Sequence, residues 1–183
     1  MELVWPDAQY LRSYCEALRR GWSPNNLRPE VAQEELQVIQ RNPDAYFQGI
    51  VNFRGGGPGV KLPDGSEVPR LPGYRNWMWD GEFCGSIQLR WQEGTHELPP
   101  YCLGHIGYSV VPWKQRRGYA TRALALMLRE ARARGLPHVE ITTTPENVAS
   151  QKVIRANGGL LVEEFEKLPS LGGGRELRFR VML

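Results

Sequence analysis

The sequence predicts a mixed α/β fold built around one crossover between parallel strands. Amphipathic helical segments are interspersed with segments rich in aromatic and β-branched residues. An apolar run over residues 103–111, an amphipathic helix and a strand over residues 138–143 follow one another, an order that normally joins two parallel strands of one sheet. No internal repeat or domain boundary is visible, and we expect residues 1–183 to form a single domain.

Residues 1–45 are expected to form one strand and two helices. Residues 3–5 predict a short strand, and Asp7 then caps a first helix that ends at Gly21. The second helix is predicted over residues 29–41, because Pro29 suits a first helical position. The pair Asn42-Pro43 is expected to end it.

A segment rich in glycine and proline, residues 54–72, interrupts the regular pattern. We expect it to be a surface loop inserted into the fold. Loops of this length are often binding loops or lids, and a disordered insertion explains the composition equally well.

Strand signals return after this loop. Residues 74–79 and 83–91 predict two strands joined at Asp80-Gly81, which is a strong hairpin signal. Small and apolar residues at helical spacing predict a helix over residues 120–131, with Gly135 as its stop. The remaining predicted elements are a short helix over residues 147–156 and two closing strands over residues 160–165 and 176–181.

Charge and cysteine content disfavour several classes of protein. The net charge of +3 is too small to indicate a nucleic-acid-binding protein, although residues 114–134 carry seven lysine or arginine residues against one acid. That local excess suits an anionic ligand, or it forms a solvated helix face. The three cysteines lack metal-ligand spacing, so we expect no metal and a reduced, cytoplasmic setting. No signal peptide or membrane-spanning apolar segment is visible.

A basic loop over residues 115–120 has the features of an anion-binding turn. It follows a predicted strand and opens a predicted helix, whose first amides have no acceptor within the helix. Gly118 allows a phosphate to approach the backbone, the small Ala120 avoids crowding it, and Arg116 and Arg117 add positive charge. The spacing differs from that of nucleoside-triphosphate and dinucleotide loops.

The sequence Gln115-Arg116-Arg117-Gly118-Tyr119-Ala120 matches the [RQ]-x-x-G-x-[GA] pyrophosphate loop of the GNAT superfamily of acyl-CoA-dependent N-acyltransferases. Residues 106–112 resemble the central strand of that family, and Asn147, Ser150 and residues 157–159 resemble its second motif. The likeness covers residues 77–161 and includes a GHIGY sequence, residues 104–108, that is typical of a bacterial branch. It implies a central mixed sheet of about six to seven strands flanked by about four helices, with parallel strands that splay at the cofactor site.

The resemblance implies that acetyl-CoA, or another acyl-CoA, is the cosubstrate and that a primary amine of a small molecule or protein amino terminus accepts the acyl group. The pantetheine arm would lie against Val110 and Val111, where a backbone amide would polarise the thioester carbonyl. The pyrophosphate would sit on the amides from Arg116 to Thr121. Asn147 would contact the cofactor from the second side, or it caps the helix that follows. The implied cofactor-binding residues are Val110, Val111, Gln115, Arg116, Arg117, Gly118, Tyr119, Ala120, Thr121, Asn147 and Ser150.

The same resemblance suggests His105 as the general base. It lies six residues before Val111, where the histone-acetylating branch has its catalytic glutamate, and histidine titrates near neutrality. The alternative is a histidine packed for structural reasons. Many relatives also carry a tyrosine that protonates the leaving thiolate, and Ile154 stands at that position here. The thiolate then leaves unaided, or another group such as Tyr108 serves.

Two further functions stay open from the sequence. The absent tyrosine allows a non-catalytic acyl-CoA sensor, and the basic helix allows a nucleic-acid-binding module, which the modest net charge disfavours. We expect a small-molecule or peptide amine as partner, no nucleic acid and no membrane, and a homodimer is allowed. Four aromatic residues either frame an acceptor pocket or, as we favour, pack against the first two helices: Tyr74, Trp77, Trp79 and Trp91.

Overall fold

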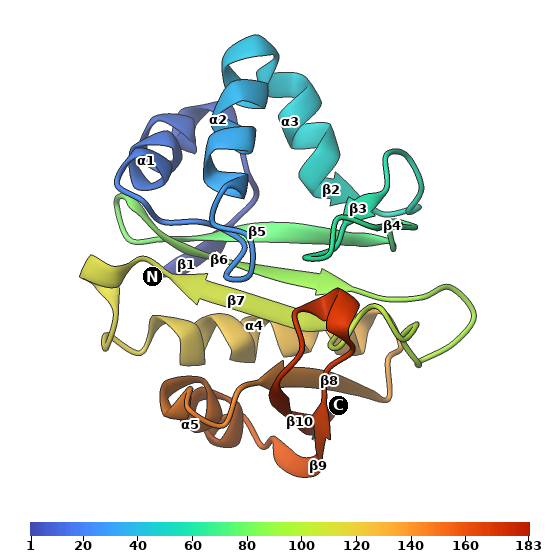
Figure 1. Ribbon diagram of the computed structural model, residues 1–183. Coiled ribbons are helices and arrows are strands. Elements are labelled where there is room, and N and C mark those ends of the chain that lie inside the picture. Colours follow the sequence, from blue (N-terminus) through green and yellow to red (C-terminus); the bar gives the residue numbers. More distant parts are fainter.

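The computed structural model describes residues 1–183 and has helices on both faces of a split central sheet (Figure 1). In the larger, five-stranded sheet, β1 (Glu2–Val4) and β2 (Val51–Asn52) both pair with β5 (Gly73–Trp79), and β6 (Phe83–Arg90) and β7 (Ile106–Val110) follow. The smaller sheet has the order β8 (His138–Thr143), β10 (Arg175–Met182), β9 (Leu160–Glu166). The predicted mixed α/β class is therefore confirmed.

Five α-helices surround these sheets. On one face of the larger sheet lie α1 (Ala8–Arg19), α2 (Val31–Arg41) and α3 (Pro43–Ile50), and on the opposite face lies α4 (Tyr119–Ala133) (Figure 1). The fifth helix, α5 (Val148–Ala156), packs against α4 and β8. None of the five combines the length and the hydropathy needed to cross a bilayer.

The helix α3 is the main departure from the predicted elements. The sequence predicts only a stop at Asn42-Pro43, but α3 begins at this pair. The Asn42 side chain accepts a hydrogen bond from the Ala45 amide, and Pro43 occupies a first-turn position, where its missing N–H costs nothing. The pair therefore ends α2 and starts a new helix at the same point.

Two hydrophobic clusters hold the layers together. One joins the larger sheet to α4 and the smaller sheet, and its fully buried side chains include Ile87, Leu124 and Phe179. The other joins the sheet to α1, α2 and α3, and in it Trp77 stacks on Tyr14 with ring centroids 4.4 Å apart. Trp77 has no exposed surface, so the core role favoured for it from the sequence is correct.

Residues 54–72 form the predicted loop, with a short hairpin of β3 (Val60–Lys61) and β4 (Glu67–Val68) as its only regular structure. The Arg70 guanidinium fastens the loop to the end of α3 by donating to the Gly49 carbonyl, 2.7 Å away. The loop thus lies beside the end of α3, at the edge of a cavity described below.

The strands β7 and β8 run in the same direction but belong to different sheets (Figure 1). One backbone hydrogen bond joins them near their beginnings, from the His105 N–H to the Glu140 carbonyl, at 2.7 Å. The backbones of the two strands also approach closely at Gly104, where a Cβ would be 3.0 Å from the Glu140 carbonyl oxygen. No strand pairing continues beyond this point, so the two strands are splayed toward Val110, the arrangement that the resemblance implies.

Candidate active site

The edge of β7 that faces away from β6 presents backbone groups to the gap beside β8. At the two ends of the β6–β7 pairing, the Arg90 amide donates to the His105 carbonyl and the Val111 amide donates to the Cys84 carbonyl. Residues of an antiparallel strand alternate between groups bonded to the partner and groups that point away from it. Val110 lies between bonded pairs, so its N–H and C=O point into the gap, whereas the Val111 amide is already occupied.

After β7, a single turn of 3₁₀ helix, η1 (Pro112–Lys114), leads to the loop that opens α4. The six consecutive amides from Arg116 to Thr121 donate to no protein acceptor, and the first bond of this helix runs from the Arg122 amide to the Gly118 carbonyl. Arg116 and Gly118 have φ angles of 61° and 74°, in the left-handed region. Residues in this conformation help successive amides to line a concave anion site, and the α4 dipole adds positive potential there.

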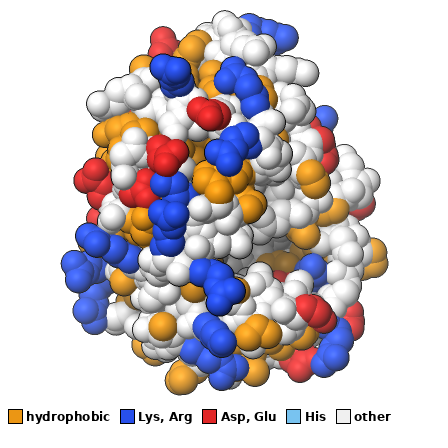
Figure 2. Space-filling model, turned by 90° about the vertical axis from the view of Figure 1, so that its left-hand side faces the viewer, with side chains coloured by type: hydrophobic (Ala, Val, Ile, Leu, Met, Phe, Trp, Pro, Cys, Tyr) orange, Lys and Arg blue, Asp and Glu red, His pale blue; other side chains and the backbone are white.

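The predicted cofactor loop is exposed and positively charged. Gln115, Arg116, Arg117 and Gly118 are all exposed, and Tyr119 to Thr121 are partly buried. The Gln115 side chain also donates to the Val110 carbonyl, 3.4 Å away, which links the loop to the gap. Viewed from the side on which α4 and α5 begin, the surface is hollowed near its centre, with lysine and arginine side chains around the hollow (Figure 2). The positively charged loop over residues 115–121 therefore fits a phosphate-bearing ligand.

Asp80, in the hairpin turn between β5 and β6, holds this loop in place through hydrogen bonds at both of its ends. Its carboxylate accepts hydrogen bonds from the Lys114 ammonium at 3.0 and 3.1 Å and from the Tyr119 hydroxyl at 2.6 Å. Burial by itself raises the pKa of Asp80, but the bonds from Tyr119 and Lys114 outweigh it and lower the pKa to about 2. The sequence indicates only a turn here, since nothing local shows that Asp80 reaches residues 34 and 39 positions further on.

The helix α5 contributes the second side of the gap. Asn147 caps it, because its side-chain oxygen accepts from the Ser150 amide at 3.1 Å, so the cap role is present. The Tyr108 hydroxyl lies 2.9 Å from the Ser150 hydroxyl and bridges β7 to α5. Burial raises the pKa of Tyr108 to about 12, partly offset by its bond to Ser150. Ile154 is fully buried in the core, so no hydroxyl stands at that position.

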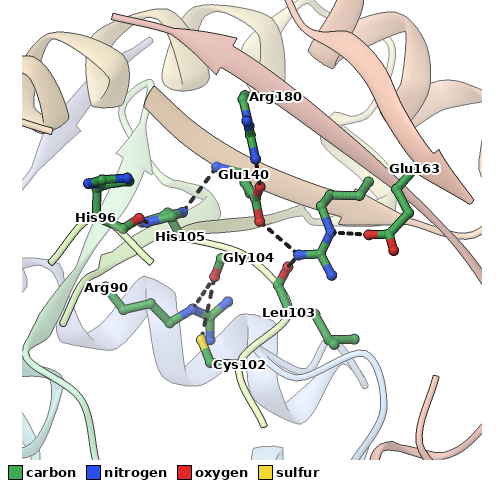
Figure 3. A network of polar contacts seen from close by, with 10 residues as sticks. Arg90, His96, Cys102, Leu103, Gly104, His105, Glu140, Glu163 and Arg180 are labelled. Atoms are coloured by element: carbon green, nitrogen blue, oxygen red, sulfur yellow. Dashed lines mark hydrogen bonds and ion pairs between the residues drawn. The ribbon is translucent and has the colours of Figure 1, made fainter. Parts of the chain in front are cut away.

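The His105 side chain is buried, and both of its ring nitrogens form hydrogen bonds with the backbone. Its side chain is 1 % exposed and does not line the cavity. Its Nδ1 accepts from the Glu140 amide at 3.0 Å, so the proton is on Nε2, which donates to the His96 carbonyl at 3.2 Å (Figure 3). Burial lowers the pKa of His105 to about 4. Because both nitrogens are occupied, this geometry disfavours the role of general base that the resemblance suggested.

This environment predicts a pH-dependent contribution of His105 to stability. Its pKa is lower in the folded protein than in the unfolded chain, where it is about 6.5, so the unfolded state binds more protons as the pH falls through this window. Between pH 7.5 and pH 5, we expect the parent protein to lose about 2 kcal/mol more stability than the His105→Gln variant. Urea unfolding at both values measures the difference.

Two results, one from urea unfolding and one from an activity assay of the same variant, would contradict the structural role of His105. An identical pH dependence in parent and variant would mean that His105 does not gain its low pKa on folding. Loss of nearly all turnover in a well-folded His105→Gln protein at pH 7.5 would instead restore the catalytic role.

A cavity of about 1100 Å³ connects the gap with the helical layer. Its lining runs from α2, α3 and the 58–71 segment, across β6 and β7, to Thr143, Asn147 and Ser150. An acyl group held in the gap and an amine held under α2 and α3 would therefore meet in one continuous space. This is the arrangement that group transfer between two bound molecules requires.

The split sheet, the open edge at Val110 and the row of free amides are the features of an acyltransferase that uses an acyl-CoA. The sequence profile of the acetyltransferase (GNAT) domain matches residues 7–159. The chain thus belongs to the GNAT acetyltransferase family.

Solved structures with the same fold include several acetyltransferases. A putative ribosomal-protein-serine acetyltransferase from Vibrio cholerae is 18% identical, with a TM-score of 0.60 over 99% of this chain and 92% of the other. The ribosomal L7/L12 α-N-protein acetyltransferase RimL, in complex with coenzyme A, is 14% identical, with a TM-score of 0.63 over 99% and 93%. A chimera of the spermidine N-acetyltransferase SpeG from Vibrio cholerae with hSSAT is 10% identical, with a TM-score of 0.60 over 100% and 96%. A sequence comparison with curated proteins gives no match.

Proposed function

We propose that residues 1–183 act as one N-acetyltransferase domain, which transfers an acetyl group from acetyl-CoA to a primary amine of a small molecule or a protein amino terminus. The observation that carries the proposal is the row of six unpaired amides, Arg116 to Thr121, beside the open edge of β7. A phosphate-bearing ligand on these amides would direct the rest of its chain along the gap toward Val110. The coenzyme A complex of RimL supports the same kind of cosubstrate.

Each part of the chain would have a distinct task. The loop amides, with Arg116 and Arg117, would hold the pyrophosphate, and Asp80 would keep the loop in place through Lys114 and Tyr119. Acetyl-CoA supplies an activated acyl group as a thioester. The Val110 amide would donate to the carbonyl oxygen of that group and stabilise the negative charge that develops as the amine attacks.

The proton transfers would use groups other than His105. An amine with a pKa near 10 must lose a proton before it attacks, and the cavity is open enough for water to accept it. The Tyr108 and Ser150 hydroxyls, 2.9 Å apart at the cavity wall, would be placed to protonate the leaving thiolate. A thiolate with a pKa near 8.5 can also leave without a proton donor, so Ile154 does not prevent turnover.

The neighbouring structures support an amine acceptor without choosing among amines. Their names specify ribosomal proteins in two cases and spermidine in the third. The buried Ile154 favours one other candidate, a sensor that binds acyl-CoA without turnover.

Turnover separates these two functions. We expect purified protein to release free CoA from acetyl-CoA when a panel of primary amines is supplied, and a thiol reagent measures the release. Acetyl-CoA at 100 times its dissociation constant should add about 2.7 kcal/mol of stability. Stabilisation by acetyl-CoA with no CoA release for any amine would favour the sensor, and the absence of both effects would contradict the proposal.

A further inference from the structure

The charges that line the cavity are unequally paired. Six cations and four carboxylates face it. Three of these cations form ion pairs with three of these carboxylates: Arg28 with Glu34 at 2.6 Å, Arg75 with Glu35 at 2.9 Å, and Lys167 with Glu176 at 3.2 Å. The three remaining cations are Lys61, Arg70 and Arg90, and the one remaining carboxylate is Glu67. The cavity therefore carries a positive excess, which opposes a polycationic acceptor.

Arg90, at the end of β6, is the unpaired cation on the floor of the cavity. Its Nε donates to the Gly104 carbonyl at 2.9 Å, which fixes the side chain, while Nη1 and Nη2 have no protein partner (Figure 3). The guanidinium is partly buried and forms no ion pair with any carboxylate of the chain. A guanidinium held in this way presents two parallel donors, the geometry that binds a carboxylate or a phosphate.

Gln88 and Gly107 complete the site. Gln88 lies two residues before Arg90 on β6, so both side chains are on the same face of the sheet, and the Gln88 side chain forms no hydrogen bond with the protein. A Cβ on Gly107 would lie 3.2 Å from both Arg90 Nη2 and Gln88 Nε2. Because Gly107 has no side chain, the two donor groups can lie close together against this part of β7.

The distance from this pair to Val110 limits the acceptor. Gly107 and Val110 are three residues apart on β7, and a strand rises about 3.3 Å per residue, so the two positions are about 10 Å apart. An α-amino acid is too short to bridge them, since its amine and carboxylate share one carbon. A longer ω-amino acid bridges them, as does a peptide amino terminus with an acidic residue near its third position.

We propose that the amine acceptor carries an anionic group about 10 Å from the reacting nitrogen, and that Arg90 and Gln88 bind this group. The inference rests on the proposed acetyl transfer and specifies its acceptor. The anion has the same chemistry in a free ω-amino acid and in a peptide side chain, so the experiment includes both.

A matched series of amines tests the small-molecule source. 8-Aminooctanoate places its charges about 10 Å apart, octylamine removes the carboxylate, and 1,8-diaminooctane replaces it with a cation. We expect kcat/KM for 8-aminooctanoate to exceed that for octylamine about 10- to 100-fold, the range for a charge-assisted hydrogen bond. Amidated tripeptides Ser-Ala-Glu, Ser-Ala-Gln and Ser-Ala-Lys test the peptide source with the same comparison.

Variants assign the preference to Arg90. Arg90→Gln should reduce the ratio of kcat/KM between 8-aminooctanoate and octylamine to about 1, and Arg90→Lys should retain part of it. The control is Arg129→Gln, which removes the same charge from an exposed position of α4 outside the cavity and should keep the parent ratio. Arg90→Lys also covers the case in which loss of the bond to Gly104 prevents folding of Arg90→Gln.

The outcomes separate this inference from the function on which it rests. Equal kcat/KM for the three amines in the parent, or a preference for the diamine, would overturn the anion site while leaving acetyl transfer intact. If no amine is acetylated, acetyl transfer fails, and calorimetry with 8-aminooctanoate on the CoA-loaded protein still tests Arg90. Weaker binding by Arg90→Gln than by Arg129→Gln would then support the anion site, and equal binding would overturn it.

Discussion

Replacing Gly118 with aspartate is expected to weaken acetyl-CoA binding at least about 100-fold, because a carboxylate then stands among the amides that would receive the pyrophosphate. The substitution should leave the fold intact. A Cβ at Gly118 meets no atom within 4 Å, and aspartate is one of the few residues that tolerates its φ of 74°. Titration calorimetry measures the affinity, and thermal unfolding confirms that the variant is folded.

Gly118→Asn is the matched control for this charge. Asparagine has the same shape and tolerates the same backbone conformation, but it is neutral. We expect it to retain affinity within about 10-fold of the parent, since like-charge repulsion is absent. A folded Gly118→Asp protein that binds acetyl-CoA as well as Gly118→Asn does would place the cosubstrate away from the loop.

The second large effect is expected at Gly85, which lies opposite Val110 in the β6–β7 pairing. A Cβ there would be 2.2 Å from the Ser109 carbonyl oxygen and 2.8 Å from the Val110 Cα, and the φ of Gly85 is 149°. Both contacts are with backbone, so only a shift of β7 can relieve them. Gly85→Ala should therefore destabilise the fold by about 3 kcal/mol or more and displace the Val110 amide, with loss of turnover.

Gly94→Ala provides the comparison for Gly85→Ala. Gly94 also has a positive φ, 74°, but a Cβ on it meets nothing within 4 Å, so only backbone strain of about 1–2 kcal/mol is expected, with turnover retained. Urea unfolding and CoA release are measured on both variants. If Gly85→Ala were as stable and as active as Gly94→Ala, the close approach of β6 to the reacting end of β7 would be wrong.

Most helices and strands could be predicted because their signals are local. The strand β8 occupies residues 138–143 as predicted, and the amphipathic spacing after Gly118 forms α4. The error at α3 has a local cause as well. Asparagine followed by proline can both end one helix and cap the next, and here it does both, with Tyr46 of the second helix packed against Tyr14 of α1.

The candidate site was predictable to different degrees. The loop over residues 115–120 could be found because its free amides belong to one continuous turn. The Asn147 cap is also a local feature, because the Ser150 amide that donates to its side chain is only three residues further on. Asp80 and Arg90 could not be assigned from the sequence. Their roles depend on where the β5–β6 hairpin places them against residues far along the chain.

The sequence by itself determined the order of most elements, the position of the basic turn over residues 115–120 and the family, because hydrophobic period, capping and turn chemistry act over a few residues. The tertiary structure alone decided that the Val110 amide is free and that of Val111 is not, since this depends on the register with β6. It also turned His105 toward Glu140 and away from the cavity, and left Arg90 without a carboxylate. Hydrogen-bond partners, burial and pKa are set by whichever distant segments pack together, and a linear pattern does not carry that information.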